Sequence, residues 1–215
     1  MFNNFFRKNI VPKTDSQEYE ILINAVKEIK ALDGLTLEIG CYKGGSSLLI
    51  MKTLLANNDK KVHIGIDPYG NIDYCHWENR IDKGIRNYTD LVKNEMLCDL
   101  YTWCFENNME FKFFNLEDTE FFNRFSDGVP VYDRKYLDNK QIINDYALVF
   151  FDGPHSTDLI KTEITFFQKK ILKNGFMVVD DINQYNHMGI LDRYILSLGF
   201  NIFEKAEFKI SYIKC

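Results

Sequence analysis

Two spacings of apolar residues alternate along this chain. Between Gln17 and Ala31, apolar residues recur at helical spacing, which predicts an amphipathic helix that Asp33-Gly34 ends. The runs Leu35–Ile39 and Val62–Asp67 are short and apolar and stop at turn residues, so both are predicted strands. Ala147–Phe151 is apolar almost throughout, which is typical of a strand covered on both faces of a sheet.

The rest of the chain continues this alternation. Further helices are predicted at Ser46–Ala56, Asn87–Asn107, Phe121–Phe125, Leu159–Leu172 and Leu191–Leu198. Further strands are predicted at Glu110–Phe114, Phe176–Val179, Asn201–Glu204 and Lys209–Ile213, the last two close enough in sequence to pair antiparallel. In the long helix, the residues expected to be buried are Leu91, Met96, Leu97, Leu100, Trp103 and Cys104. This order predicts an α/β fold with a mostly parallel sheet and a C-terminal antiparallel strand pair.

A length of 215 residues predicts a single domain over residues 1–215. Two less regular stretches, near 68–108 and 126–145, are predicted to embellish it. Ser126–Asp145 is polar and contains Asp-Gly and Val-Pro breakers, so it is predicted to be a long loop. Loops this long in compact domains are often functional. Candidates for a lid over a bound substrate are therefore its residues Tyr132, Asp133, Arg134 and Tyr136.

Composition narrows the functional classes. The net charge is −5, which argues against non-specific binding to nucleic acid. The five cysteines form no C-x-x-C pair, so neither a disulfide framework nor a zinc knuckle is expected. The sequence shows neither a signal peptide nor a run of 18 apolar residues, so no membrane span is predicted. We expect a cytoplasmic protein with reduced thiols and a small-molecule partner, and a homo-oligomer is compatible with the sequence.

The turn after the first strand is rich in glycine and opens a helix. It reads Glu38-Ile-Gly40-Cys-Tyr-Lys-Gly44-Gly45-Ser46, which departs from the dinucleotide fingerprint G-x-G-x-x-G. Glycine allows backbone to approach a ligand closely, and Glu38 suits a ligand with a cationic amine. Asp67 ends the second strand, where a carboxylate can accept hydrogen bonds from both ribose hydroxyls. Instead of binding a ligand, the glycine-rich segment could simply form a tight strand–helix turn, and Asp67 could cap the turn before Pro68.

Acidic residues also follow the later strands. After the third strand, Glu117 or Asp118 is a candidate acceptor for an adenine amino group, and a helix cap is the alternative. Asp152 and His155 follow the fourth strand, and Asp180 and Asp181 follow the fifth. Adjacent parallel strands bring these groups together, and three carboxylates repel each other unless a cation lies among them. Hard oxygen ligands suit Mg²⁺ or a similar ion. Capping roles for the aspartates and a structural role for His155 remain open.

These motifs together resemble a known family. E-x-G-x-x-x-G-G-S, then G-I-D, F-F-D-G-P-H and V-V-D-D, is similar to the class I S-adenosylmethionine-dependent methyltransferases. Within them it resembles the branch of macrocin-type sugar O-methyltransferases and cephalosporin-hydroxylase-like proteins, over roughly residues 35–182. The resemblance implies a Rossmann-like, doubly wound sheet. It also implies that Glu38, Gly40 and Gly44 line the methionine and ribose end of the cofactor.

The resemblance further assigns roles to the other site residues. Asp67 holds the ribose, Glu117 or Asp118 lies near adenine, and Asp152 borders the cofactor. By analogy, Asp152, Asp180 and Asp181 bind a divalent cation that lowers the pKa of the attacking hydroxyl. His155 or Asp152 then serves catalysis, with His155 as general base and His187 as a second candidate.

We therefore predict an S-adenosylmethionine-dependent O-methyltransferase acting on a small polar acceptor, with a sugar or sugar-containing intermediate favoured. Two rivals remain open. One is an enzyme binding NAD or a nucleotide-sugar, against which the missing G-x-G-x-x-G and the early Glu38 count. The other is a non-catalytic nucleotide-binding protein on a methyltransferase scaffold.

Overall fold

The computed structural model describes residues 16–70, 72–75, 85–132, 140–153, 156–183 and 189–215. The helices are α1 (Tyr19–Glu28), the 3₁₀ turn η1 (Ile29–Ala31), α2 (Gly45–Ala56), α3 (Asp90–Asn107), α4 (Asp118–Arg124), α5 (Thr157–Phe167) and α6 (Ile190–Ser197). The strands are β1 (Leu35–Ile39), β2 (His63–Ile66), β3 (Ile72–Cys75), β4 (Ile85–Tyr88), β5 (Phe111–Phe114), β6 (Val129–Tyr132), β7 (Lys140–Ile143), β8 (Tyr146–Phe151), β9 (Ile171–Val179), β10 (Phe200–Lys205) and β11 (Ile210–Lys214). Within these ranges, no helix combines the length and apolar character needed to cross a bilayer.

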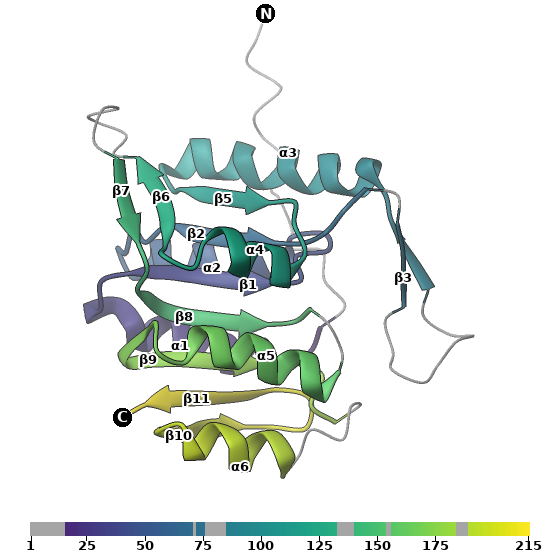
Figure 1. The fold of residues 1–215 in the computed structure, drawn as a ribbon. Helices are drawn as coiled ribbons and strands as arrows, with labels where there is room; N and C mark the ends of the chain where they lie inside the picture. Colours follow the sequence, from purple (N-terminus) through teal and green to yellow (C-terminus); the bar gives the residue numbers. More distant parts are fainter. Residues whose placement is uncertain (1–15, 71, 76–84, 133–139, 154–155, 184–188) are drawn as a thin grey trace, which may run out of the picture.

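The centre of the molecule is a seven-stranded sheet in the order β10-β11-β9-β8-β1-β2-β5 (Figure 1). β9, β8, β1, β2 and β5 are parallel, and β11 pairs antiparallel with both β9 and β10. From β1 the chain adds β2 and β5 on one side of the sheet. After β5 it returns to the other side of β1, where β8 and β9 follow. The predicted α/β, Rossmann-like fold with a C-terminal antiparallel strand pair is therefore confirmed.

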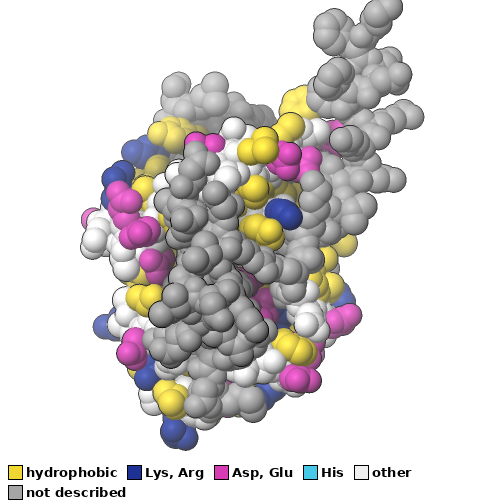
Figure 2. Space-filling view, turned by 90° about the vertical axis from the view of Figure 1, so that its right-hand side faces the viewer, with side chains coloured by type: hydrophobic (Ala, Val, Ile, Leu, Met, Phe, Trp, Pro, Cys, Tyr) yellow, Lys and Arg dark blue, Asp and Glu magenta, His cyan; other side chains and the backbone are white. Residues whose placement is uncertain are grey.

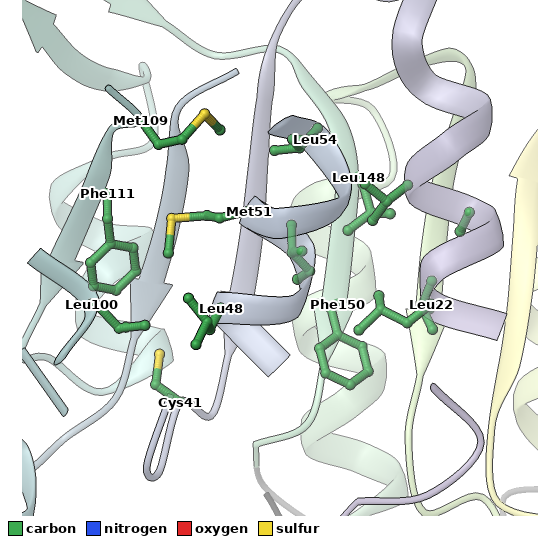
Figure 3. Packing of buried hydrophobic residues seen from close by; sticks show 14 of the residues in the cluster. Leu22, Cys41, Leu48, Met51, Leu54, Leu100, Met109, Phe111, Leu148 and Phe150 are labelled. Atoms are coloured by element: carbon green, nitrogen blue, oxygen red, sulfur yellow. The ribbon is translucent and has the colours of Figure 1, made fainter. Parts of the chain in front are cut away.

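Helices cover both faces of this sheet, and each face carries its own apolar core. In β8, Leu148 and Phe150 pack with α1, α2 and α3, whereas Val149 and Phe151 pack with α4, α5 and α6. Figure 3 shows the first core, with Leu48 and Met51 of α2 lying between the residues of β8 and those of α3 and β5. A strand with apolar side chains on both sides has no face to offer water, which explains the continuous apolar run in the sequence.

The register of the sheet lines up the ends of its strands. One row of paired residues crosses it: Phe114, Ile66, Ile39, Phe151, Val179 and Ile210. The next row along the same edge is Asn115, Asp67, Gly40, Asp152 and Asp180, with Lys209 opposite Asp180 because β11 runs antiparallel. Polar residues from five separate parts of the sequence thus meet at one edge, as expected where ligands bind in such sheets.

The predicted long loop at 126–145 is wrong, because its ends form the antiparallel hairpin β6–β7. This hairpin leads directly into β8 and lies at the end of the sheet opposite the carboxyl ends of the parallel strands (Figure 1). Tyr132 is on the hairpin, so the structure does not support a lid at this position; Asp133, Arg134 and Tyr136 lie outside the described residues. The other embellishment, near 68–108, contains the hairpin β3–β4. This hairpin borders the edge of the sheet at which the parallel strands end.

Two helix predictions also need correction. The helix expected at Leu159–Leu172 ends at Phe167, because Ile171 already pairs with Tyr146 in the sheet. Ile164, Phe167 and Ile171 keep helical spacing across this junction, so the apolar pattern does not show where the helix ends and the strand begins. The helix expected at Asn87–Asn107 begins at Asp90, where the Thr89 hydroxyl accepts a hydrogen bond from the Val92 N–H at 3.2 Å.

The buried face of α3 is mostly as predicted. Met96, Leu100, Trp103 and Cys104 are buried, and Leu97 is partly buried. Leu91 is 67% exposed, so its predicted burial is wrong. The next residue in the same turn, Val92, packs against the core instead, so Leu91 lies on the outer side of the helix.

Two leucines of α3 give a test of this packing. Leu100→Ala should cost about 2–5 kcal/mol of unfolding free energy, because it leaves a cavity in the core shared with α2. Leu91→Ala should change it by less than about 0.5 kcal/mol, since that side chain stays in water. Urea unfolding measures both, and equal losses would contradict the assigned face of α3.

Candidate functional site

A cavity of about 340 Å³ opens at the carboxyl ends of β1, β2 and β8. Its lining residues come from the strand ends, the end of β4 and the starts of α4 and α5: Ile39, Gly40, Ile66, Asp67, Pro68, Tyr88, Glu117, Asp118, Thr119, Asp152, Gly153 and Leu159. Figure 2 looks onto this side of the molecule, where hydrophobic, acidic and basic side chains are all seen. The predicted residues Gly40, Asp67, Glu117, Asp118 and Asp152 are all brought together here.

Gly40 lets two strand ends come close. Its φ is +89°, and a Cβ on it would lie 2.2 Å from the backbone oxygen of Asp152. The approach is held by two hydrogen bonds: the Gly40 N–H donates to the Ile66 oxygen, and the Asp152 N–H donates to the Ile39 oxygen, both at 2.9 Å. No side chain fits this position, so glycine is required by the sheet itself as well as by any ligand above it.

Asp67 fixes the glycine-rich turn. It is almost fully buried, and its Oδ2 accepts hydrogen bonds from the N–H groups of Cys41 at 2.8 Å and Tyr42 at 2.9 Å. Burial raises the pKa of this carboxyl to about 7, although the two N–H donors act in the opposite direction. Asp67 is therefore a cavity-lining acid whose charge changes near neutral pH.

Two predicted cofactor residues lie outside the cavity lining. Glu38 is fully buried, and its two carboxylate oxygens accept hydrogen bonds from the hydroxyls of Ser46 and Ser47 in the first turn of α2. Gly44 precedes α2 with a φ of +77°, and a Cβ there would point at Met96 and Leu100. Glu38 thus ties the start of α2 to β1, and Gly44 lets the same turn lie against α3, so neither residue lines the cavity.

The far wall of the cavity combines acidic and aromatic groups. Glu117 and Asp118 lie at the start of α4, where the Asp118 Oδ1 accepts a hydrogen bond from the Thr119 N–H at 2.7 Å. Tyr88, at the end of β4, has its ring 5.5 Å from those of both Tyr42 and Tyr69. No sequence pattern pointed to Tyr88, because it reaches the cavity only through the pairing of β3 with β4.

The three predicted metal ligands have a different cation beside them. The Lys209 ammonium is fully buried and lies 2.5 Å from the Asp180 Oδ1. Asp152 lines the cavity, whereas Asp180 and Asp181 do not. Burial and the nearby Asp180 raise the pKa of Asp152, while Lys209 lowers it. Among the described residues, no three His, Cys, Asp or Glu side chains form a group that could hold a metal ion. The predicted magnesium site is therefore not supported.

Both histidines considered for catalysis, His155 and His187, lie outside the described residues. Lys209 is the residue beside these carboxylates that the sequence analysis did not single out. It was placed at the start of the last strand, but only the register of β11 against β9 shows that it faces Asp180.

Comparison with known proteins follows from this geometry. A protein-family model described as a methyltransferase domain matches residues 37–182, which is more than half of the chain. No curated protein matches significantly.

Solved structures share the fold at low sequence identity. The O-methyltransferase NovP has a TM-score of 0.61 at 13% identity, over 91% of this chain and 78% of NovP. The calicheamicin methyltransferase CalS11 has a TM-score of 0.62 at 11% identity, over 90% of this chain and 78% of CalS11. A Podospora anserina methyltransferase, PaMTH1, solved with bound SAH (S-adenosylhomocysteine), has a TM-score of 0.52 at 10% identity, over 93% of this chain and 79% of PaMTH1.

Gly40 and Gly199 have nearly equal positive φ, but only Gly40 lies close to another backbone segment. Comparing alanine substitutions at the two therefore distinguishes the cost of the backbone conformation from the cost of the clash. Gly40→Ala should destabilise the protein by about 2–5 kcal/mol, because positive φ and the clash with Asp152 add together. Gly199→Ala should cost only about 1–2 kcal/mol, since Gly199 has a φ of +87° but nothing within 4 Å of the added Cβ. Denaturant unfolding measures the difference, and a smaller loss for Gly40→Ala would rule out the tight β1–β8 contact.

Proposed function

The chain belongs to the methyltransferase-domain family, and from this premise we propose that it is an S-adenosylmethionine-dependent O-methyltransferase of a small polar acceptor. We favour a sugar or sugar-containing acceptor. The observation that carries the proposal is an acidic cavity built directly on the glycine-rich turn.

The charge of the cavity selects among nucleoside ligands. Four carboxyl groups line it, from Asp67, Glu117, Asp118 and Asp152, and no Lys or Arg is among its described lining residues. A sulfonium and an α-amino group are both cations and are attracted to such a wall. A pyrophosphate is an anion and is repelled by it. This favours S-adenosylmethionine over the NAD or nucleotide-sugar alternative.

Asp67 is the proposed ribose ligand. Its Oδ2 already accepts two backbone N–H groups, which hold the carboxylate at the cavity wall. A carboxylate in this position accepts hydrogen bonds from neighbouring hydroxyls, as in other sheets of this type. Glu117 and Asp118, at the start of α4, are the proposed acceptors for the adenine amino group.

When bound, S-adenosylmethionine supplies a methyl group on a cationic sulfur. The chain must hold an acceptor hydroxyl in line with that methyl and remove its proton, and positioning provides much of the rate. Asp152 lines the cavity, and burial raises its pKa, which makes its carboxylate a better proton acceptor. We assign proton removal to Asp152 or to His155, three positions later in the sequence.

The sugar acceptor rests on two supports. The motifs in residues 35–182 resemble sugar O-methyltransferases, and the fold is shared with CalS11, which is described as a TDP-rhamnose 3′-O-methyltransferase. Tyr88, at the end of β4, lines the cavity, so we assign acceptor contacts to the β3–β4 hairpin that carries it.

Binding of S-adenosylhomocysteine tests the cofactor assignment. The wild-type chain should bind it and should not bind NAD. Asp67→Ala should weaken binding at least about tenfold, because a charged acceptor contributes on the order of 1.5–3 kcal/mol. Asp59→Ala is the matched control, since Asp59 lies before the same strand, β2, and pairs with Lys61 away from the cavity. Calorimetry giving tighter binding of NAD, or equal affinities for both variants, would contradict the proposal.

The pH dependence of binding provides a second test. Asp67 has a pKa of about 7, and only its charged form accepts from both ribose hydroxyls. Affinity for S-adenosylhomocysteine should therefore fall as pH drops below 7, by up to about tenfold per unit. Asp67→Asn should bind more weakly at pH 8 and lose this pH dependence. Calorimetry between pH 5 and pH 8 checks both variants, and parallel profiles would exclude Asp67 as the titrating group.

A further inference from the structure

Lys209 is a buried cation beside the proposed reaction centre. Its side chain is fully buried, with Nζ 2.5 Å from the Asp180 Oδ1 and 2.9 Å from the Ser16 Oγ, to which it donates. The same Nζ lies 4.7 Å above the Phe150 ring and 5.4 Å from the centre of the Tyr19 ring. A buried ammonium is costly unless anionic and aromatic groups surround it, and here both do.

The position of this ammonium follows from the sheet register. Val179 pairs with Ile210 across β9 and β11, so Asp180 and Lys209 are the next residues on facing strands. Phe151 pairs with Val179, so Asp152 is the next residue on the other side of Asp180. The cation is therefore placed at the carboxylates that the sequence suggested for a metal.

We propose that the Lys209 ammonium takes the place of a divalent cation at Asp152 and Asp180, so that the site needs no metal. Lys209 does not line the cavity, so it is a positioning residue that acts through its carboxylate neighbours. This inference rests on the proposed function only for the reaction that the site serves.

The oxygens of Asp180 are already engaged. Its Oδ1 accepts from Lys209 and from the Asp181 N–H at 2.9 Å, and its Oδ2 accepts from the Ser16 hydroxyl. A dication bound there would displace these donors and would lie beside a buried ammonium. Both effects oppose binding, because like charges at short range in a buried site repel strongly.

The backbone of Lys209 is also held from the N-terminal side. The Glu18 carboxylate accepts hydrogen bonds from the N–H groups of Glu207 at 3.1 Å, Phe208 at 2.7 Å and Lys209 at 3.0 Å. The Phe208 oxygen accepts from the Ile182 N–H at 3.0 Å, just after the acidic pair. The turn before β11 is thus fixed from two directions, which holds the backbone of Lys209 beside Asp180.

Manganese binding tests the proposal in the whole chain, with the electron paramagnetic resonance signal of free Mn²⁺ as the readout. After dialysis against EDTA, the wild-type chain should bind no Mn²⁺ with a Kd below about 1 mM. Its affinity for S-adenosylhomocysteine should be the same with and without EDTA. Stoichiometric Mn²⁺ binding by the wild type, lost in Asp180→Asn, would overturn the proposal.

Removing the ammonium should open the site to a metal. Lys209→Ala should bind Mn²⁺ at least about tenfold more tightly than the wild type, a gain of about 1.4 kcal/mol. Lys209→Ala/Asp180→Asn should lose that gain. Lys205→Ala is the matched control, because Lys205 forms an ion pair with Asp192 at 2.7 Å on the protein surface, and it should gain nothing. If a folded Lys209→Ala chain binds Mn²⁺ no more tightly than the wild type, the Lys209–Asp180 ion pair is purely structural and the proposal is overturned.

Stability gives an independent readout, and the wild-type result decides the case if Lys209→Ala does not fold. Lys209→Ala should lower Tm by about 6–20 °C, because it leaves the buried Asp180 without its partner. The double variant should recover at least half of this loss, and Lys205→Ala should shift Tm by less than about 4 °C. A wild type that fails to bind S-adenosylhomocysteine would count against the proposed function, whereas the Mn²⁺ result would still decide the role of Lys209.

Discussion

The hydrogen-bond register of five neighbouring strands is the constraint on which the site depends. Once Ile66, Ile39, Phe151, Val179 and Ile210 are paired across the sheet, the residues beside them must share one edge. A slip of one residue would turn each side chain to the other face and break the row. The buried apolar side chains on both faces of β8 oppose such a slip, so the two cores also fix the positions of the polar groups.

That row concentrates negative charge, and the structure balances it with different groups at different places. Below that row, both carboxylate oxygens of Glu38 accept hydrogen bonds from serine hydroxyls. Within the row, Asp180 is paired with a buried ammonium. Asp67 receives two backbone N–H groups, but burial still raises its pKa to about 7. Each carboxyl group thus reaches a different compromise between desolvation and its donors.

Local patterns in the sequence predicted the helices, the strands of the main sheet and the glycine turn, because apolar periodicity and turn residues are local signals. They did not show the hairpins β3–β4 and β6–β7. Gly40 and Asp67 needed only their places at the ends of two predicted strands. Lys209 could not be predicted in the same way. Its role depends on pairing between β9 and β11, and the sequence showed two strands but not their register. The end of α5 failed for a related reason, since the apolar Ile171 serves a strand and fits a helical pattern equally well.

Residue type alone therefore does not decide which acid serves a ligand. Glu38, near the end of β1, and Asp67, just after β2, were both predicted from the sequence to contact the cofactor. Glu38 points beneath the turn and gives both oxygens to α2, whereas Asp67 lines the cavity. Asp152 and Asp180 differ in the same way, since only Asp152 lines the cavity and Asp180 is held by Lys209 and Ser16. In each pair one acid builds the support, and its neighbour lines the cavity where a ligand can reach it.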